Sequence, residues 1–216
     1  CRKTKGLRVV PHWKHEIAAG VKEGVIVCGV DEVGRGPLAG PVVACAVVLP
    51  QEGLSRSFLR RVKDSKQIDR EEREEVAAIL REKAAYCVGK VEVEEIDSIN
   101  ILRASHLAML RAYEGLPSRP AHALVDGNQA PNLPCPITCI ISGDAISLSI
   151  AAASIIAKVE RDKIMRELAT AHPLYGWETN VGYSTKEHLT AIRTHGPTPY
   201  HRRSFRPVYE LQLPID

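Results

Sequence analysis

The sequence contains no apolar run that is long enough to cross a membrane. The apolar stretch Val42–Leu49 has eight residues, whereas a membrane helix needs about 18. The charged first residues are also not followed by the apolar core and small-residue cleavage site of a secretion signal. We therefore expect a cytoplasmic protein that does not bind a membrane.

Cysteine and aromatic residues are few, and their positions argue against two further kinds of site. The six cysteines form no Cys-x-x-Cys pair, which argues against a zinc site. Cys28, Cys45 and Cys87 lie within apolar runs, where a reduced cysteine packs as a small hydrophobic residue. Trp13 and Trp177 are isolated, so they do not form a platform for stacking nucleic-acid bases.

The overall composition is typical of a folded chain with one core and a small appendage. Hydrophobic residues make up 44% and charged residues 25% of the 216 residues. Residues 1–24 and 181–206 each carry +4, and since the whole chain carries +3, the rest carries −5. Basic ends on an acidic body suit a protein that binds a polyanion. Solvated termini explain the same charges equally well.

Hydrophobic periodicity predicts alternating strands and helices, which is typical of an α/β fold. The expected strands are Val25–Val30, Val42–Leu49, Tyr86–Val93, His122–Val125 and Ile137–Ile141. The expected helices are Asp69–Ala85, Glu94–Tyr113, Ser147–Leu168 and Glu187–Thr194. Asp69 and Glu72 have the spacing of a capping box and mark the start of the first helix.

Acidic residues follow three of the expected strands. Asp31 and Glu32 come after the first strand, and Asp126 and Asp144 come at or after the ends of two later strands. Loops at strand ends meet at one crevice in an open α/β sheet. Four carboxylates there would repel one another unless a cation lay among them, and oxygen ligands favour Mg²⁺ or Mn²⁺. Taken singly, Asp126 is more typical of a turn residue and Asp144 of a helix cap than of a metal ligand.

A glycine-rich loop follows the first acidic pair. Gly34-Arg35-Gly36 offers backbone N–H groups that no Cβ obstructs, which suits close approach to a sugar–phosphate backbone. No Gly-Lys-Ser/Thr follows, so the loop is not of the Walker type. Alone it indicates no more than a tight turn.

The segment Gly29-Val30-Asp31-Glu32-Val33-Gly34-Arg35-Gly36-Pro37-Leu38-Ala39-Gly40-Pro41 closely resembles the first signature of bacterial ribonuclease HII. Similar motifs continue in the order of that family from about Val25 to Val208. They are Asp64-Ser65-Lys66, Ile96-Asp97-x-Ile99-Asn100-Ile101-Leu102, Val125-Asp126-Gly127-Asn128, Gly143-Asp144, Ile150–Val159 with Arg161-Asp162, Gly182-Tyr183-x-Thr185-x-x-His188 and His201-Arg202-Arg203-Ser204-Phe205.

The resemblance implies a ribonuclease-H-like mixed sheet flanked by helices, with a C-terminal helical extension. It implies an endonuclease that cleaves the RNA strand of RNA–DNA hybrids, and DNA at embedded single ribonucleotides, leaving 5′-phosphate and 3′-hydroxyl ends. Such an enzyme serves ribonucleotide removal and RNA primer removal. The family's metal-binding and catalytic acids fall on Asp31, Glu32, Asp126 and Asp144, which implies two divalent cations, Mg²⁺ or Mn²⁺.

Substrate contacts are implied by the same resemblance. The loop that senses the 2′-hydroxyl falls on Gly34-Arg35-Gly36, and the residue that senses the junction falls on Tyr183. We interpret Lys66, Arg202 and Arg203 as phosphate contacts, with a solvated surface as the alternative. For His188 and His201 we expect structural or phosphate-facing roles. Ser142 and Val181 stand where the family commonly has lysine.

The sequence suggests a division into three parts and a monomeric protein. The parts are a basic N-terminal arm or leader over 1–24, a catalytic core over 25–170 and a C-terminal extension over 171–216. Three alternatives compete: a non-catalytic hybrid-binding module, another nuclease of the same fold, and ribonuclease HIII. Retention of all four acids argues against the first and the Gly-Arg-Gly loop with Tyr183 against the second. The length argues against the third, whose members usually carry a folded N-terminal domain.

Overall fold

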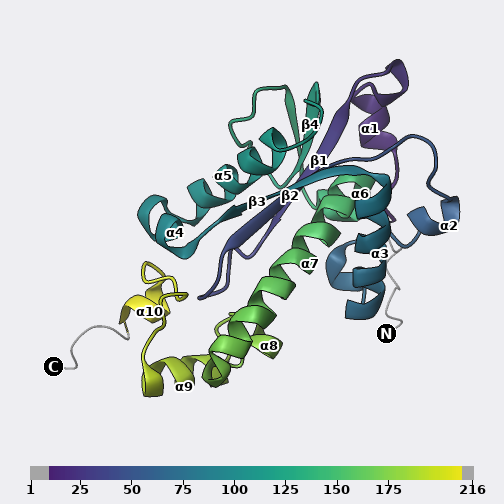
Figure 1. The fold of residues 1–216 in the computed structure, drawn as a ribbon. Coiled ribbons are helices and arrows are strands. Elements are labelled where there is room, and N and C mark those ends of the chain that lie inside the picture. The colour runs from purple at the N-terminus through teal and green to yellow at the C-terminus, as the bar shows by residue number, and fades with distance from the viewer. Residues whose placement is uncertain (1–9, 211–216) are drawn as a thin grey trace, which may run out of the picture.

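A five-stranded mixed sheet forms the centre of the computed structural model, which describes residues 10–210 (Figure 1). The strands lie in the order β3-β2-β1-β4-β5. β1 pairs antiparallel with β2, as β2 does with β3, whereas β1–β4 and β4–β5 are parallel. Their bounds are β1 Val27–Val33, β2 Val42–Val48, β3 Ala85–Val91, β4 His122–Asp126 and β5 Ile137–Ile140. The expected strands and mixed sheet are confirmed.

Helices cover both faces of the sheet. Alternate side chains of β2 point to opposite faces, and since both sets are apolar, both faces are buried. Val43, Cys45 and Val47 pack against α3 (Arg70–Lys83) and α7 (Leu148–Ala171). On the other face, residues such as Ala44 contribute to a core that includes α5 (Ile101–Glu114), which lies beside α4 (Val93–Ile99). Figure 1 shows these two helical layers on either side of the strands.

The single helix expected over Glu94–Tyr113 is wrong, because Asn100 divides it into α4 and α5. Asn100 has φ +70°, and its side chain accepts hydrogen bonds of 3.1 Å from the backbone of Leu102 and Arg103. Asparagine tolerates positive φ and competes well for backbone N–H groups. It therefore ends one helix and caps the next.

The cap expected at Asp69 is confirmed, since its side chain accepts a hydrogen bond of 2.9 Å from the Glu72 backbone at the start of α3. The long helix α7 runs three residues beyond the expected end, to Ala171. Short elements that the sequence analysis did not predict fill the connections. They are α1 Lys14–Ala18, α2 Arg56–Leu59, α6 Gly143–Ile146, α8 Trp177–Asn180 and α10 Arg206–Glu210, with 3₁₀ turns at Val21–Glu23, Ser65–Gln67 and Pro173–Tyr175.

The chain after α7 packs back against the loop that follows β1. Leu38 and Ala39 of that loop share a buried cluster with Met165 of α7 and with Trp177 and Ile192 of the C-terminal region. Ile192 lies on α9 (Lys186–His195), which lies close to the expected bounds. The C-terminal helices are thus fastened to the strand that carries the first two acids.

At the other end of the chain, residues 10–24 also pack on the core. Val21 shares a buried cluster with Val27 and Ile150, and the backbone N–H of His12 donates to the Ile146 carbonyl at 3.1 Å. Of the proposed arm or leader, the basic residues Arg2, Lys3, Lys5 and Arg8 lie outside the described residues.

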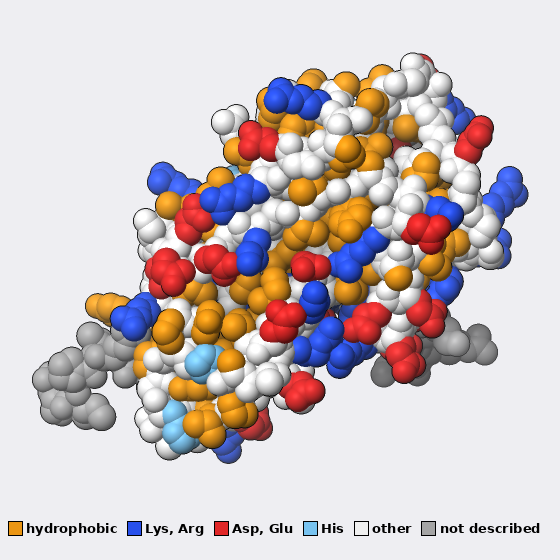
Figure 2. All heavy atoms as spheres, in the orientation of Figure 1, with side chains coloured by type: hydrophobic (Ala, Val, Ile, Leu, Met, Phe, Trp, Pro, Cys, Tyr) orange, Lys and Arg blue, Asp and Glu red, His pale blue; other side chains and the backbone are white. Residues whose placement is uncertain are grey.

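On the face that carries α3 and α7, charges of both signs are interspersed (Figure 2). Ion pairs link the two helices, with Arg81 at 2.8 Å from Glu160 and Arg166 at 3.3 Å from Glu74. This face therefore offers no continuous basic surface to a polyanion. Within residues 10–210, no helix is long and apolar enough to span a membrane.

Candidate active site

The four predicted acids lie on neighbouring elements at one region of the sheet. Asp31 and Glu32 lie within β1 and not after it, because β2 pairs with β1 as far as Val33. Asp126 is the last residue of β4, and Asp144 lies on α6, which follows β5. The parallel pairing of β1, β4 and β5 brings these positions together.

Burial and mutual repulsion shape the electrostatics of the group. Asp31 is 6% and Asp144 7% exposed. Burial raises the pKa of Asp31 well above its usual value, and the charges of Glu32, Asp126 and Asp144 raise it further. Burial also raises the pKa of Asp144, with Asp126 as the next cause. The four carboxylates therefore lie close enough to influence one another's ionisation.

Two of the acids are held by cationic side chains. Arg35 Nη1 lies 3.2 Å from Glu32 Oε1, and Lys66 Nζ lies 3.7 Å from Asp144 Oδ2. Burial lowers the pKa of Lys66, but Asp144 and the other nearby carboxylates outweigh this and raise it overall. Lys66 and Arg35 thus neutralise part of the negative charge while remaining largely exposed, at 81% and 50% of their side chains.

The donor set suits a hard divalent cation in its chemistry. Within residues 10–210, no group of three or more His, Cys, Asp or Glu side chains is arranged to hold a metal ion. The fit therefore rests on the type of ligand, because the four acids offer only oxygen donors, which Mg²⁺ and Mn²⁺ prefer. Their negative charge also exceeds the positive charge of the nearby Arg35 and Lys66. Ligation by Glu32 and Asp144 would replace their contacts with Arg35 and Lys66.

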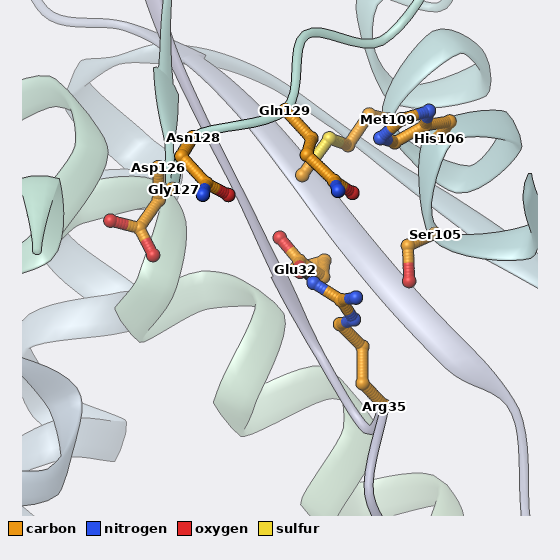
Figure 3. Close-up of a pocket in the computed structure, with 9 residues that line it drawn as sticks. All are labelled: Glu32, Arg35, Ser105, His106, Met109, Asp126, Gly127, Asn128 and Gln129. Atoms are coloured by element: carbon orange, nitrogen blue, oxygen red, sulfur yellow. Dashed lines mark hydrogen bonds and ion pairs between the residues drawn. The ribbon is translucent and has the colours of Figure 1, made fainter. Parts of the chain in front are cut away.

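A small pocket of about 80 Å³ opens beside Glu32 (Figure 3). The Glu32 and Arg35 side chains lie between the loop after β4 and the helix α5, which contributes Ser105 and His106. Burial lowers the pKa of His106, and the charge of Arg35 acts in the same direction. His106 is therefore neutral near pH 7. Sequence reasoning gave it no role, since a lone polar residue on a helix carries no signal of what faces it.

Two buried arginines hold the glycine-rich loop and the residues that follow it through hydrogen bonds to backbone carbonyls. Arg202 is 0% exposed and donates hydrogen bonds of 2.6–3.0 Å to three loop carbonyls, those of Gly34, Arg35 and Gly40. Burial, with the nearby charge of Arg161, lowers the pKa of Arg202 to about 9. Its guanidinium cannot reach a phosphate, so the interpretation of Arg202 as a phosphate contact is wrong.

Arg161 is the second of these arginines, and sequence reasoning assigned it no role. It is 0% exposed and donates to the carbonyls of Pro41, Ala39 and Val181 at 3.0–3.1 Å. A Cβ at Gly34 would overlap the Arg161 side chain, and Gly34 has φ +94°. Gly34 is therefore required both for the turn and for the close approach of Arg161.

Tyr183 lies beside the glycine-rich loop. A Cβ at Gly36 would lie 3.5 Å from the Tyr183 ring, and the Leu38 backbone donates to the Gly182 carbonyl at 2.7 Å. Tyr183 is 46% exposed, so it is not a core aromatic. Arg203 is exposed beside the buried Arg202. Among the predicted contacts, Arg35, Gly36, Lys66, Tyr183 and Arg203 are exposed, whereas Gly34 and Arg202 are buried.

With this geometry established, comparison with known proteins identifies the family. A sequence model described as Ribonuclease HII matches residues 28–208. The chain belongs to the ribonuclease HII family. This is the family of type 2 ribonucleases H, metal-dependent endonucleases that act on nucleic acid.

Similar ribonucleases HII and solved structures support the assignment. The chain is 56% identical over 198 residues to Ribonuclease HII of Paramagnetospirillum magneticum (92% of this chain, 98% of the relative). It is 54% identical to that of Chlorobium luteolum (83% and 88%). The ribonuclease H2 structure from Pyrococcus horikoshii matches with a TM-score of 0.73 at 28% identity (86% and 96%). A Bst-RNase HIII structure in complex with Mn²⁺ shares the fold, with a TM-score of 0.68 at 20% identity (87% and 69%).

A buried polar network fixes the backbone of Tyr183 in this ribonuclease HII chain. Trp177 Nε1 donates to His188 Nε2 at 3.0 Å, so His188 carries its proton on Nδ1 and donates to the Tyr183 carbonyl at 2.8 Å. His201 Nδ1 accepts from the Thr198 backbone at 2.9 Å, which leaves its Nε2–H to donate to His188 Nε2 at 3.0 Å. Both histidines are 0% exposed, so their role is structural.

Proposed function

We propose that the chain cleaves the RNA strand of RNA–DNA hybrids and cleaves DNA at embedded single ribonucleotides. The products carry 5′-phosphate and 3′-hydroxyl ends, as ribonucleotide and RNA primer removal require. The observation that carries this proposal is the position of Tyr183 against Gly36, which follows Asp31 by five residues and Glu32 by four. Sugar recognition and acid chemistry therefore share one surface.

Asp31, Glu32, Asp126 and Asp144 are the proposed catalytic acids and would hold two divalent cations, Mg²⁺ or Mn²⁺. When bound, the ions supply an activated water and stabilise the leaving 3′-oxygen. The chain contributes an electronegative set of carboxylates, two of them buried and two half-buried, which the strands β1 and β4 and the helix α6 position. Arg35 and Lys66 neutralise part of the set, and because they are exposed they are proposed to contact the phosphates of a bound duplex.

Substrate choice rests on the sugar and not on the base. A 2′-hydroxyl is what distinguishes RNA from DNA, and the Gly34-Arg35-Gly36 backbone is proposed to bind it. Arg202 and Arg161 hold the loop in one shape through its carbonyls before any duplex arrives. The Tyr183 ring is proposed to pack against the following deoxyribose, where an added hydroxyl would crowd it. Lys66 and Arg203 are proposed phosphate contacts.

We propose a monomer that works in a reducing compartment such as the cytoplasm. Each cysteine in the described part of the chain is free, including the buried Cys28 and Cys45, as is usual for proteins of reducing compartments. We also propose that the chain is divided into an N-terminal segment over 1–24, a catalytic core over 25–170 and a C-terminal extension over 171–216. An RNase HII from Archaeoglobus fulgidus has been solved in a complex with PCNA, with a TM-score of 0.65 to this chain.

A cleavage assay tests the proposal. The substrates are a DNA duplex with one ribonucleotide, the matching all-DNA duplex and an RNA–DNA hybrid, each with Mg²⁺, Mn²⁺ or chelator. We expect metal-dependent cleavage of the first and third substrates and none of the all-DNA duplex. Binding of the hybrid without cleavage under any metal condition would favour a non-catalytic binding module.

A further inference from the structure

Glu16 is a buried carboxylate at the start of α7. It lies on α1, is 1% exposed, and is separated by 131 residues from the serine that caps α7. Its Oε1 accepts three hydrogen bonds: from Ser147 Oγ at 2.6 Å, from the Ser149 backbone at 2.9 Å and from Ser149 Oγ at 2.8 Å. A distant segment thus adds a second cap to the helix.

The arrangement is costly for the folded state. The other carboxylate oxygen, Oε2, is buried and has no hydrogen-bond partner among the described residues. A buried carboxylate with one unsatisfied oxygen loses hydration that its partners do not fully replace. The partial positive charge at the N-terminus of α7 offsets part of this loss. The cap at Ser147 would start the helix without Glu16, because its side chain already accepts from Ile150 at 3.3 Å.

The contacts of α1 and its neighbours converge on the turn that carries Asp144. Ser147 follows Asp144 by three residues, and its backbone N–H donates to the Gly143 carbonyl at 2.8 Å. His12 contacts the same turn through the Ile146 carbonyl. The segment 12–16 therefore holds the junction between α6 and α7 on both sides.

The same turn also reaches a second acid. The Gly143 backbone N–H donates to Asp126 Oδ1 at 2.6 Å. Gly143 approaches so closely that a Cβ there would lie 2.6 Å from the Ile150 side chain. A shift at the start of α7 would therefore move Asp144 directly and Asp126 through Gly143.

We propose that Glu16 is a positioning residue that holds the α6–α7 junction and thereby sets Asp144 and Asp126 for metal binding. The inference rests on the proposed function, since it takes these acids as metal ligands. It makes the described residues 10–24 part of the frame of the active site. Groups that orient metal ligands in this way typically change metal affinity by about 10–100-fold when they are removed.

The test compares Glu16→Ala and Glu16→Gln with Asp69→Ala, which removes the cap of α3 at an exposed position. Two titrations with Mn²⁺ are measured for each variant: the rise in melting temperature, and cleavage of a duplex with one ribonucleotide. We expect Glu16→Ala to raise the half-saturating Mn²⁺ concentration about 10–100-fold in both titrations. Glu16→Gln keeps an oxygen for the three donors and should recover most of the affinity. Asp69→Ala should lower the melting temperature and leave the Mn²⁺ requirement unchanged.

A Glu16→Ala protein that melts earlier but keeps the wild-type Mn²⁺ requirement would overturn the inference, because Glu16 would then be only a helix cap. If Glu16→Ala does not fold, Ser149→Ala removes one donor to Glu16 and should raise the requirement less, but in the same direction. An unchanged requirement in Ser149→Ala would then overturn the inference. Asp144→Asn is measured alongside: wild-type metal binding and cleavage there would contradict the proposed ligand set, and not the role of Glu16.

Discussion

At the scale of the residue, Asp31 shows how burial and like charge act together. Burial and three neighbouring carboxylates raise the pKa of Asp31 above its unfolded value. The folded, metal-free protein therefore binds a proton more tightly than the unfolded chain, and its stability falls as the pH rises from the unfolded pKa through the folded pKa. Above the folded pKa, Asp31 is ionised in the folded protein, and the loss of folding stability reaches its full value.

Replacing Asp31 by asparagine should therefore abolish cleavage and stabilise the metal-free protein. Asp31→Asn removes a proposed metal ligand, and it also removes the repulsion between Asp31 and the neighbouring carboxylates. We expect a higher melting temperature than wild type in chelator at about pH 8, with the difference shrinking as the pH is lowered. Thermal denaturation across pH measures it. Glu52→Gln, which removes a charge at an exposed position, should show neither effect, and normal turnover of Asp31→Asn in Mg²⁺ would contradict the ligand assignment.

Val181 is a second residue that lowers the stability of the folded protein, here through its backbone conformation. It has φ +42° and ψ +33°, a left-handed conformation that disfavours β-branched side chains. Val181→Asn should relieve this strain and stabilise the protein by about 1 kcal/mol, or roughly 2–4 °C in melting temperature. Val181→Ala is the control, because it removes the same packing but keeps most of the backbone cost. Equal melting temperatures for the two variants would show that no strain is relieved.

The residue types at the site were predictable because their context is local. Asp31 and Glu32 follow a hydrophobic run, and Gly34 follows them, so the acids and the loop could be found from the sequence. Arg202 could not be assigned correctly, because an arginine in a basic tail has the same local pattern whether it faces solvent or a buried loop. Only the tertiary structure shows that the Arg202 guanidinium donates to the Gly34 carbonyl.

At the scale of the element, the C-terminal helices act as a support for one exposed ring. The Tyr183 carbonyl accepts from His188, which Trp177 and His201 hold in turn. Burial, with the neighbouring His188, lowers the pKa of His201 to about 3, so the His201 imidazole is neutral at pH 7. Strands and long helices were predictable from periodicity, whereas the break at Asn100 depended on a single side chain that caps the backbone.

Truncating Tyr183 should affect activity far more than stability. Tyr183→Ala should lose about 100-fold in cleavage at a single embedded ribonucleotide, because the ring no longer positions the junction. Its melting temperature should change little, since the side chain is 46% exposed. Tyr200→Ala, at a tyrosine that is 40% exposed in the same region, is the control. A large fall in melting temperature with an equal loss on every substrate would make Tyr183 a structural residue.

At the scale of the whole molecule, the arrangement of charged side chains on each face matters more than the net charge of the chain. The face of α3 and α7 carries interspersed, paired charges (Figure 2). Lys66 instead lies exposed beside Asp144, and Arg203 is exposed next to Arg202, which holds the glycine-rich loop. The basic ends noted in the sequence could not reveal this, because Arg202 in the C-terminal end is internal.

Hybrid affinity should fall steeply with salt, and Lys66 and Arg203 should carry part of the slope. Each phosphate contact that is lost should reduce the slope of log affinity against log salt by about 0.7–0.9. We expect this change in Lys66→Ala and in Arg203→Ala, measured by fluorescence anisotropy at several salt concentrations. Arg70→Ala on α3 is the control and should keep the wild-type slope. An unchanged slope in both test variants would place the duplex elsewhere.

The helix α7 links the separate parts of the site along one axis. It starts after the turn of Asp144, Arg161 lies further along it, and Met165 packs where a Cβ of Gly40 would lie. Its 24 residues span about 36 Å. One added residue before Arg161 would turn everything beyond it by roughly 100° and break the hold on the loop. The helix therefore acts as a spacer: its length fixes the separation between the turn that carries Asp144 and the loop carbonyls that Arg161 holds.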